Sequence, residues 1–176
     1  MAVEIDSELL DFKAKVSGKT GAMKSAINTL GDMFSTVVAA NSNARDEISS
    51  VYKTPNSPTV LSSFDSLNTS IESAKSAIND KVTAVITKAE DLISKIEKLE
   101  SLKKEIDDAE AKIKAAQAKI ASLPDGDPEI GVQQKIIDDN TKIVNEKTKE
   151  FNMAHAAAKT LLSSLKATDG TAPTID

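Results

Sequence analysis

The chain has 176 residues, a formal net charge of −5, no cysteine, and aromatic residues at only 3%. The lack of cysteine excludes disulfides, thiolate metal sites and cysteine nucleophiles, and the acidic balance offers no basic surface for nucleic acid or an anionic membrane. A core of Ala, Ile, Leu and Val forms thin layers, which favour paired long helices.

The chain begins MAVEIDSELLDFK, with acidic residues where a secretory signal has a basic and then an apolar stretch. Its apolar runs are far shorter than the roughly 20 residues that span a bilayer. We therefore expect no Sec-type signal and no membrane span. The expected location is the cytoplasm, or outside the cell after export by a non-Sec route.

The first predicted helix covers residues 7–51. From Val16 to Val51, apolar residues recur at alternating steps of three and four, the spacing of a coiled-coil seam. Residues 17–21 (SGKTG) resemble the end of a phosphate-binding loop, but position 13 is lysine where that motif has glycine. We interpret these residues as a flexible point or a close helix contact rather than a nucleotide site.

A proline-bearing break follows at residues 52–58. Proline lacks an amide donor and disfavours helix for the residue before it. Tyr52, Pro55 and Pro58 are therefore predicted to form a bend that leads into a second helix at 59–123.

The seam of this second helix widens near its middle, where Val85-Ile86 and Leu92-Ile93 form apolar doublets. A helix with two partners needs a wider apolar stripe than a helix with one. We therefore expect the first and third helices to overlap there, their ends marked by Leu9-Leu10 and Leu161-Leu162. The predicted interaction surface of the seam and overlap is Val85, Ile86, Leu92, Ile93, Ile96, Leu99, Ile106, Ile113 and Ile120.

A second break at residues 124–128 (PDGDP) precedes the third predicted helix, 129–167. Asp127, Pro128 and Glu129 have the composition of a helix cap. Residues 168–176 contain few apolar side chains and are predicted to be a disordered tail.

Three polar residues lie on the seams, namely Asn41, Asn140 and Lys147. Polar seam residues can set the register and the oligomeric state at some cost in stability. Simple solvent exposure at a loose end is the equally weighted alternative.

The predicted fold is all-α: an elongated, antiparallel, up-down-up three-helix coiled-coil rod that forms a single domain over residues 1–167. His155 is the only histidine, and no set of base, nucleophile or ligands converges with it. We therefore predict a protein that is not an enzyme and has no catalytic residue, cofactor or metal.

The first hundred residues resemble the small helical-hairpin substrates of bacterial type VII secretion, the Trp-x-Gly class and its partner proteins. The resemblance rests on Val3-Glu4-Ile5-Asp6, the helix through Ile48, the bend near Tyr52, and the later seam of Phe64, Leu67 and Ile71. Tyr52-Lys53-Thr54-Pro55 stands where that family carries Trp-x-Gly. The resemblance implies export as a folded helical dimer, or a role as adaptor or chaperone for a larger toxin.

Two functional hypotheses follow from these patterns. The first is a non-catalytic module for protein–protein interaction, which uses its helical faces to bind a protein partner or a second copy in a homodimer. The alternative is a structural coiled-coil component of a phage or cell-surface assembly, which self-assembles without a different partner.

Overall fold

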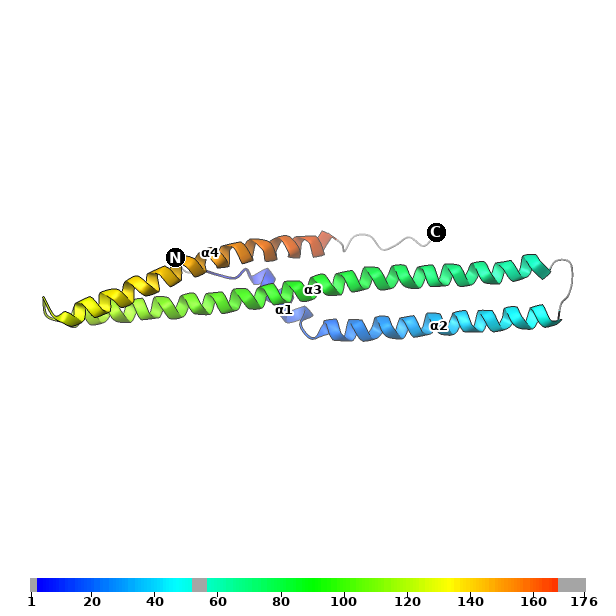
Figure 1. Cartoon of the computed structure of the whole chain (residues 1–176), viewed down its shortest axis with the longest axis horizontal. Coiled ribbons are helices and arrows are strands. Elements are labelled where there is room, and N and C mark those ends of the chain that lie inside the picture. The colour runs from blue at the N-terminus through cyan, green and yellow to red at the C-terminus, as the bar shows by residue number, and fades with distance from the viewer. Residues whose placement is uncertain (1–2, 52–56, 168–176) are drawn as a thin grey trace. The chain divides into compact units, whose positions relative to one another are not determined.

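The computed structural model describes residues 3–51 and 57–167. Four helices account for nearly all of them: α1 (Ser7–Val16), α2 (Lys19–Val51), α3 (Ser57–Ser122) and α4 (Pro128–Ala167). The described ranges contain no strand. Helix α3 packs antiparallel to α2 and antiparallel to α4, as predicted (Figure 1).

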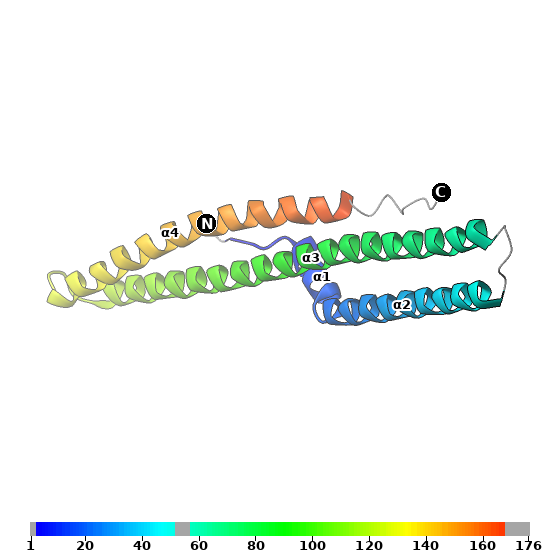
Figure 2. The ribbon, with the colours of Figure 1, turned by 45° about the vertical axis from the view of Figure 1, so that its right-hand side comes forward.

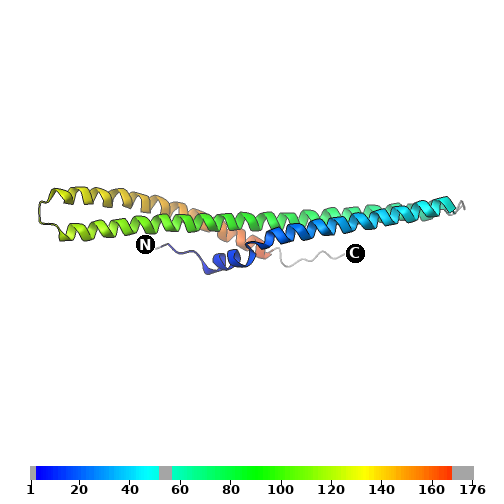
Figure 3. The ribbon, with the colours of Figure 1, turned by 90° about the horizontal axis from the view of Figure 1, so that it is seen from below.

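The chain divides into two compact units. Residues 18–89 form one unit, which we call the α2 hairpin because α2 lies antiparallel beside the first part of α3 (Figure 2). Residues 1–17 and 90–176 form the other, which we call the α4 unit; there α4 lies beside the second part of α3 (Figure 3). The elongation of the whole chain and its organisation as one domain stay predictions.

The prediction of one continuous helix over residues 7–51 is wrong, because the helix ends at Val16 and restarts at Lys19. Gly18 lies at the break with φ of +82°. This left-handed conformation costs glycine little and strains other residues, so it ends the helical path at this point. The amide of Ser17 donates a hydrogen bond to the Lys13 carbonyl (2.8 Å) and closes the last turn of α1.

The predicted break at 124–128 is confirmed, and α4 begins at Pro128. Gly126 has φ of +85°, and the carboxylate of Asp127 accepts a hydrogen bond from the Glu129 amide (2.8 Å). This is the capping role predicted for Asp127, since a side-chain oxygen satisfies one of the free amides at a helix start. Glu129 also forms an ion pair with Lys119 (2.6 Å), which joins α4 to the end of α3.

Two predicted features lie partly or wholly outside the described residues. Tyr52 and Pro55 of the predicted bend are outside them, whereas Pro58 lies in the first turn of α3 with an exposed side chain. Proline is tolerated there because the first-turn amides have no partner within the helix. The predicted tail at 168–176 is also outside the described residues.

The core of the α4 unit is shared by three helices. Leu9 of α1 packs in one cluster with Leu92, Ile96 and Leu99 of α3 and with Phe151 of α4, and all five side chains are buried. The predicted sharing of the long middle helix is therefore present in this unit. Its first partner is the ten-residue α1 rather than one end of a continuous helix.

Candidate interaction surface

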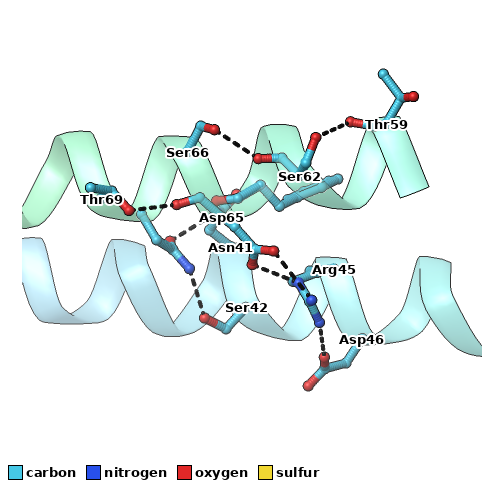
Figure 4. A network of polar contacts seen from close by, with 11 residues as sticks. Asn41, Ser42, Arg45, Asp46, Thr59, Ser62, Asp65, Ser66 and Thr69 are labelled. Carbon is cyan, nitrogen blue, oxygen red and sulfur yellow. Dashed lines mark hydrogen bonds and ion pairs between the residues drawn. The ribbon is translucent and has the colours of Figure 1, made fainter. Parts of the chain in front are cut away.

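The seam of the α2 hairpin contains a polar network (Figure 4). The side-chain amide of Asn41 donates to the carbonyl of Phe64 (2.9 Å) and to Oδ1 of Asn68 (2.7 Å), and Asn68 in turn donates to Ser42 (3.0 Å). Asn41 thus contacts the facing helix in the position where a register-setting residue would lie. One turn further along α2, an ion pair joins Arg45 Nε and an Asp65 carboxylate oxygen at 2.7 Å.

This polar seam leaves the apolar residues of the hairpin poorly covered. No side chain of α2, all of which lies within the described residues, is buried. Met33 is 61% exposed and Val37 is 51% exposed, while Leu67 on α3 is 50% exposed. Side chains of this kind normally lose most of their accessible surface in a packed domain.

The exposed apolar residues lie on one face of the hairpin. Val37 and Leu67 each come one residue before a half-buried seam position, Val38 on α2 and Asn68 on α3. A two-fold axis perpendicular to both helices relates the members of an antiparallel pair, so the same flank of each helix belongs to the same face. We call this surface the hairpin face and define it by Met23, Ala26, Leu30, Met33 and Val37 of α2 with Val60, Leu67 and Ala74 of α3.

A shallow groove on the hairpin face carries no polar surface. It lies between α2 and α3 and is lined by Met23, Ala26, Ile27, Leu30, Ile78 and Val82. A groove on the hairpin that shares Ile27, Leu30 and Ile78 has a more polar lining, which includes Asn28, Asp32, Ser35, Lys75 and Asn79. There Lys75 donates a hydrogen bond to Ser35 across the pair (3.0 Å). One side of the hairpin is thus solvated while the other presents apolar surface.

The residues predicted to form the seam and overlap differ in how much of each side chain is buried. Ile86, Leu92, Ile96, Leu99 and Ile106 are buried. The structure leaves Ile93, Ile113 and Ile120 half-buried, and Val85 is exposed. The prediction placed Val85 and Ile86 in one apolar doublet, but only Ile86 turns inward.

Asn140 and Lys147 lie on α4. Asn140 is buried and its side-chain amide donates a hydrogen bond to the Ile136 carbonyl of its own helix (2.8 Å) rather than to α3. Lys147 forms an ion pair with Glu105 of α3 (3.0 Å), and this carboxylate raises the pKa of Lys147 above its ordinary value. Of the two, Lys147 makes the cross-helix contact, and a register role for either stays a prediction.

Charged groups hold the amino-terminal segment against α4. Lys159 lies 2.7 Å from one carboxylate oxygen of Asp6, and His155 Nε2 lies 3.5 Å from the other. The hydrogen bond from Lys159 lowers the pKa of Asp6, and the same contact raises the pKa of Lys159. His155 also stacks on Phe151, with ring centroids 5.8 Å apart. His155 thus has structural neighbours in a charged cluster.

Two features bear on metal or phosphate binding in the described ranges: the grouping of His, Asp and Glu side chains, and the surroundings of residues 17–21. Residues 3–51 and 57–167 contain no group of three or more His, Asp or Glu side chains that could hold a metal ion. Residues 17–21, which resemble the end of a phosphate-binding loop, follow α1 rather than a strand and enter α2 directly. That motif requires a preceding strand and a glycine-rich turn.

The hairpin face was not identified from the heptad pattern, which placed Val37 and Leu67 inside the seam. The sequence does contain a pattern that indicates this face. Positions 19, 26, 33, 40 and 47 of α2 recur at steps of seven and are Lys, Ala, Met, Ala and Glu. A second apolar line beside the first seam indicates a second contact surface on the same helix.

No helix in the described part of the chain is both long and apolar enough to cross a membrane. No family model, curated protein or solved structure matches the chain.

Proposed function

We propose that the protein is a non-catalytic helical module for protein–protein interaction, and that the hairpin face is its binding surface. The observation that carries the proposal is the contrast between the two units. The α4 unit buries a cluster of large aliphatic side chains, whereas the hairpin leaves Met33, Val37 and Leu67 at least half exposed on one face. A contiguous apolar patch with a polar opposite side is typical of an interaction surface.

The energetics of a two-helix hairpin also support a binding role. Helices in proteins gain most of their stability from tertiary packing of an apolar face. Since α2 has no buried side chain, a partner that covers the hairpin face would add stability as well as specificity. An apolar face with few charges is suited to another helical surface, because side chains of two helices interdigitate.

The type VII interpretation remains part of the proposal as the route by which such a module would meet its partner. The hairpin of α2 and the first part of α3 supports it, because that class consists of helical hairpins. Export is tested by comparing cell and medium fractions with and without the secretion ATPase. Retention in both strains would contradict it and leave the binding role intact.

Photo-crosslinking tests the binding role. A photoreactive amino acid is placed at Met33 on the hairpin face, and at Asp32 on the opposite side of α2 as the matched control. We expect protein adducts from position 33 that are absent from position 32, with both components identified by mass spectrometry. Equal adducts from both positions, or none from position 33, would contradict the proposal.

A further inference from the structure

The hairpin face carries a heptad line that is complementary to itself when reversed. Residues 19, 26, 33, 40 and 47 of α2 are Lys, Ala, Met, Ala and Glu, all with exposed side chains. Reversal about Met33 exchanges Lys19 with Glu47 and Ala26 with Ala40. A line with a cation at one end, an anion at the other and apolar residues between can therefore pair with an antiparallel copy of itself.

From this line we propose that the occupant of the hairpin face is a second copy of the same chain, docked with the two α2 helices antiparallel. This inference rests on the proposed binding function and names its partner. In the dimer, Lys19 of each copy lies beside Glu47 of the partner subunit at the two ends of the contact. Met33 of each copy lies at the two-fold axis, and the alanines beside it allow close approach.

Lys19 and Glu47 of one chain are too far apart to form an ion pair with each other. They are 28 positions apart on a single helix, which places them about 42 Å apart at the rise of an α-helix. A parallel pair of α2 helices would instead put Lys19 beside Lys19 and Glu47 beside Glu47. Charge pattern therefore selects the antiparallel arrangement, in the way that flanking charges choose the orientation of coiled-coil partners.

The charge balance of the hairpin also permits two copies to meet. Residues 18–89 contain seven Lys or Arg and six Asp or Glu, whereas the remainder of the chain accounts for the acidic excess. A nearly neutral surface presents no long-range repulsion to its own copy, and low net charge favours association.

The size of the face matches what a stable dimer needs. The 33 residues of α2 extend about 50 Å, and two adjacent helices present a face about 20 Å wide, or about 1,000 Å² per copy. A specific protein interface buries about 800 Å² on each partner. On α3, the flank beside Leu67 continues in the small residues Ser63, Ser70, Ala77 and Ala84, which leave room for a facing helix.

Charge reversal tests this arrangement in the full chain. Lys19→Glu alone places two like charges at each end of the contact, and so does Glu47→Lys alone. Because each single variant replaces the two exposed ion pairs of the dimer by like-charge pairs, we expect it to self-associate about tenfold more weakly. The Lys19→Glu/Glu47→Lys double variant should regain the wild-type dissociation constant, and an equimolar mixture of the two single variants should form a mixed dimer.

Sedimentation equilibrium measures these constants, with circular dichroism as the check on helical content. Asp32→Lys, a charge reversal on the opposite side of α2, is the control and should leave association unchanged. Unaltered association in both single variants, or failure of the double variant to recover, would overturn the antiparallel dimer. A wild-type chain that stays monomeric but gives Met33-specific adducts with another protein would overturn the dimer and retain the binding function.

Discussion

Removal of the Leu9 side chain should weaken the packing of α1 against α3 and α4 within the α4 unit. Leu9 is 0% exposed, whereas its neighbour Leu10 is 40% exposed in the same helix, so the pair forms a matched comparison. Leu9→Ala deletes three carbon atoms from the core, which corresponds to about 2.4 kcal/mol at about 0.8 kcal/mol per methylene. A cavity adds to this loss in a rigid core, but α1 has only ten residues and can settle, so we expect a total of about 2.5 kcal/mol.

Hydrogen exchange read by mass spectrometry measures this loss locally. A helix of ten residues is marginal without tertiary packing, so the α1 amides should exchange by local opening. Leu9→Ala should lower their protection roughly 60-fold, and Leu10→Ala by less than about fivefold, since each 1.4 kcal/mol is a factor of ten. Equal losses for the two variants would refute the account of Leu9 as the buried anchor.

Three further predictions concern the break, the hairpin seam and the amino-terminal tether. Gly18→Ala should lower the stability of the helix junction by about 1 kcal/mol, because φ of Gly18 is +82°. Gly21→Ala lies inside α2 with no atom within 4 Å of the added Cβ, so it should be neutral or stabilising. Urea unfolding measures both variants, and the reverse order of stability would contradict the helix break at Gly18. Asn41→Ala should lower the unfolding free energy of the hairpin by about 1–2 kcal/mol, because two hydrogen bonds to α3 are lost. An unchanged midpoint of urea unfolding would contradict the stabilising role of Asn41. The contact between Asp6 and Lys159 lowers the Asp6 pKa and raises the Lys159 pKa, so the tether should be constant across neutral pH. It should be lost as pH falls from about 3.8 through the lowered Asp6 pKa, and lost again as pH rises through the raised Lys159 pKa. A dye on an introduced cysteine near residue 4 reports release, and release near neutral pH would contradict the pairing.

The sequence was sufficient for the corner between α3 and α4 because the signals there are local. Proline and glycine at 124–128 mark the corner, and the Asp127 cap follows from the chemistry of a helix start. Of the predicted doublet Leu9-Leu10, Leu9 joins the core that α1 shares with α3 and α4, whereas Leu10 is 40% exposed.

The break at Gly18 was not predicted as a helix end, because a single glycine within a helical pattern is often tolerated and its φ depends on how the flanking segments pack. The prediction placed Val37 and Leu67 inside the hairpin seam for a different reason. Apolar residues lie on two adjacent lines of α2, and heptad spacing does not decide which line faces α3. The choice depends on contacts far apart in sequence, such as the hydrogen bonds between Asn41 and Asn68.

The hairpin face is exposed because polar residues of α2 and α3 occupy part of the seam between the two helices. Where Asn41 and Lys75 face the partner helix, the apolar line through Val37 turns outward. A seam that accepts polar residues loses burial but gains directional contacts. The apolar residues left outside the seam then become available to a second copy.

Hydrogen exchange of the wild-type chain at low and high protein concentration tests whether two copies associate through the hairpin face, because such association stabilises the hairpin by mass action. We expect protection of the α2 amides to rise with concentration, while protection of the α4 amides near the corner at 123–127 does not change. Protection of α2 that is independent of concentration, or a rise confined to α4, would contradict association through the hairpin face.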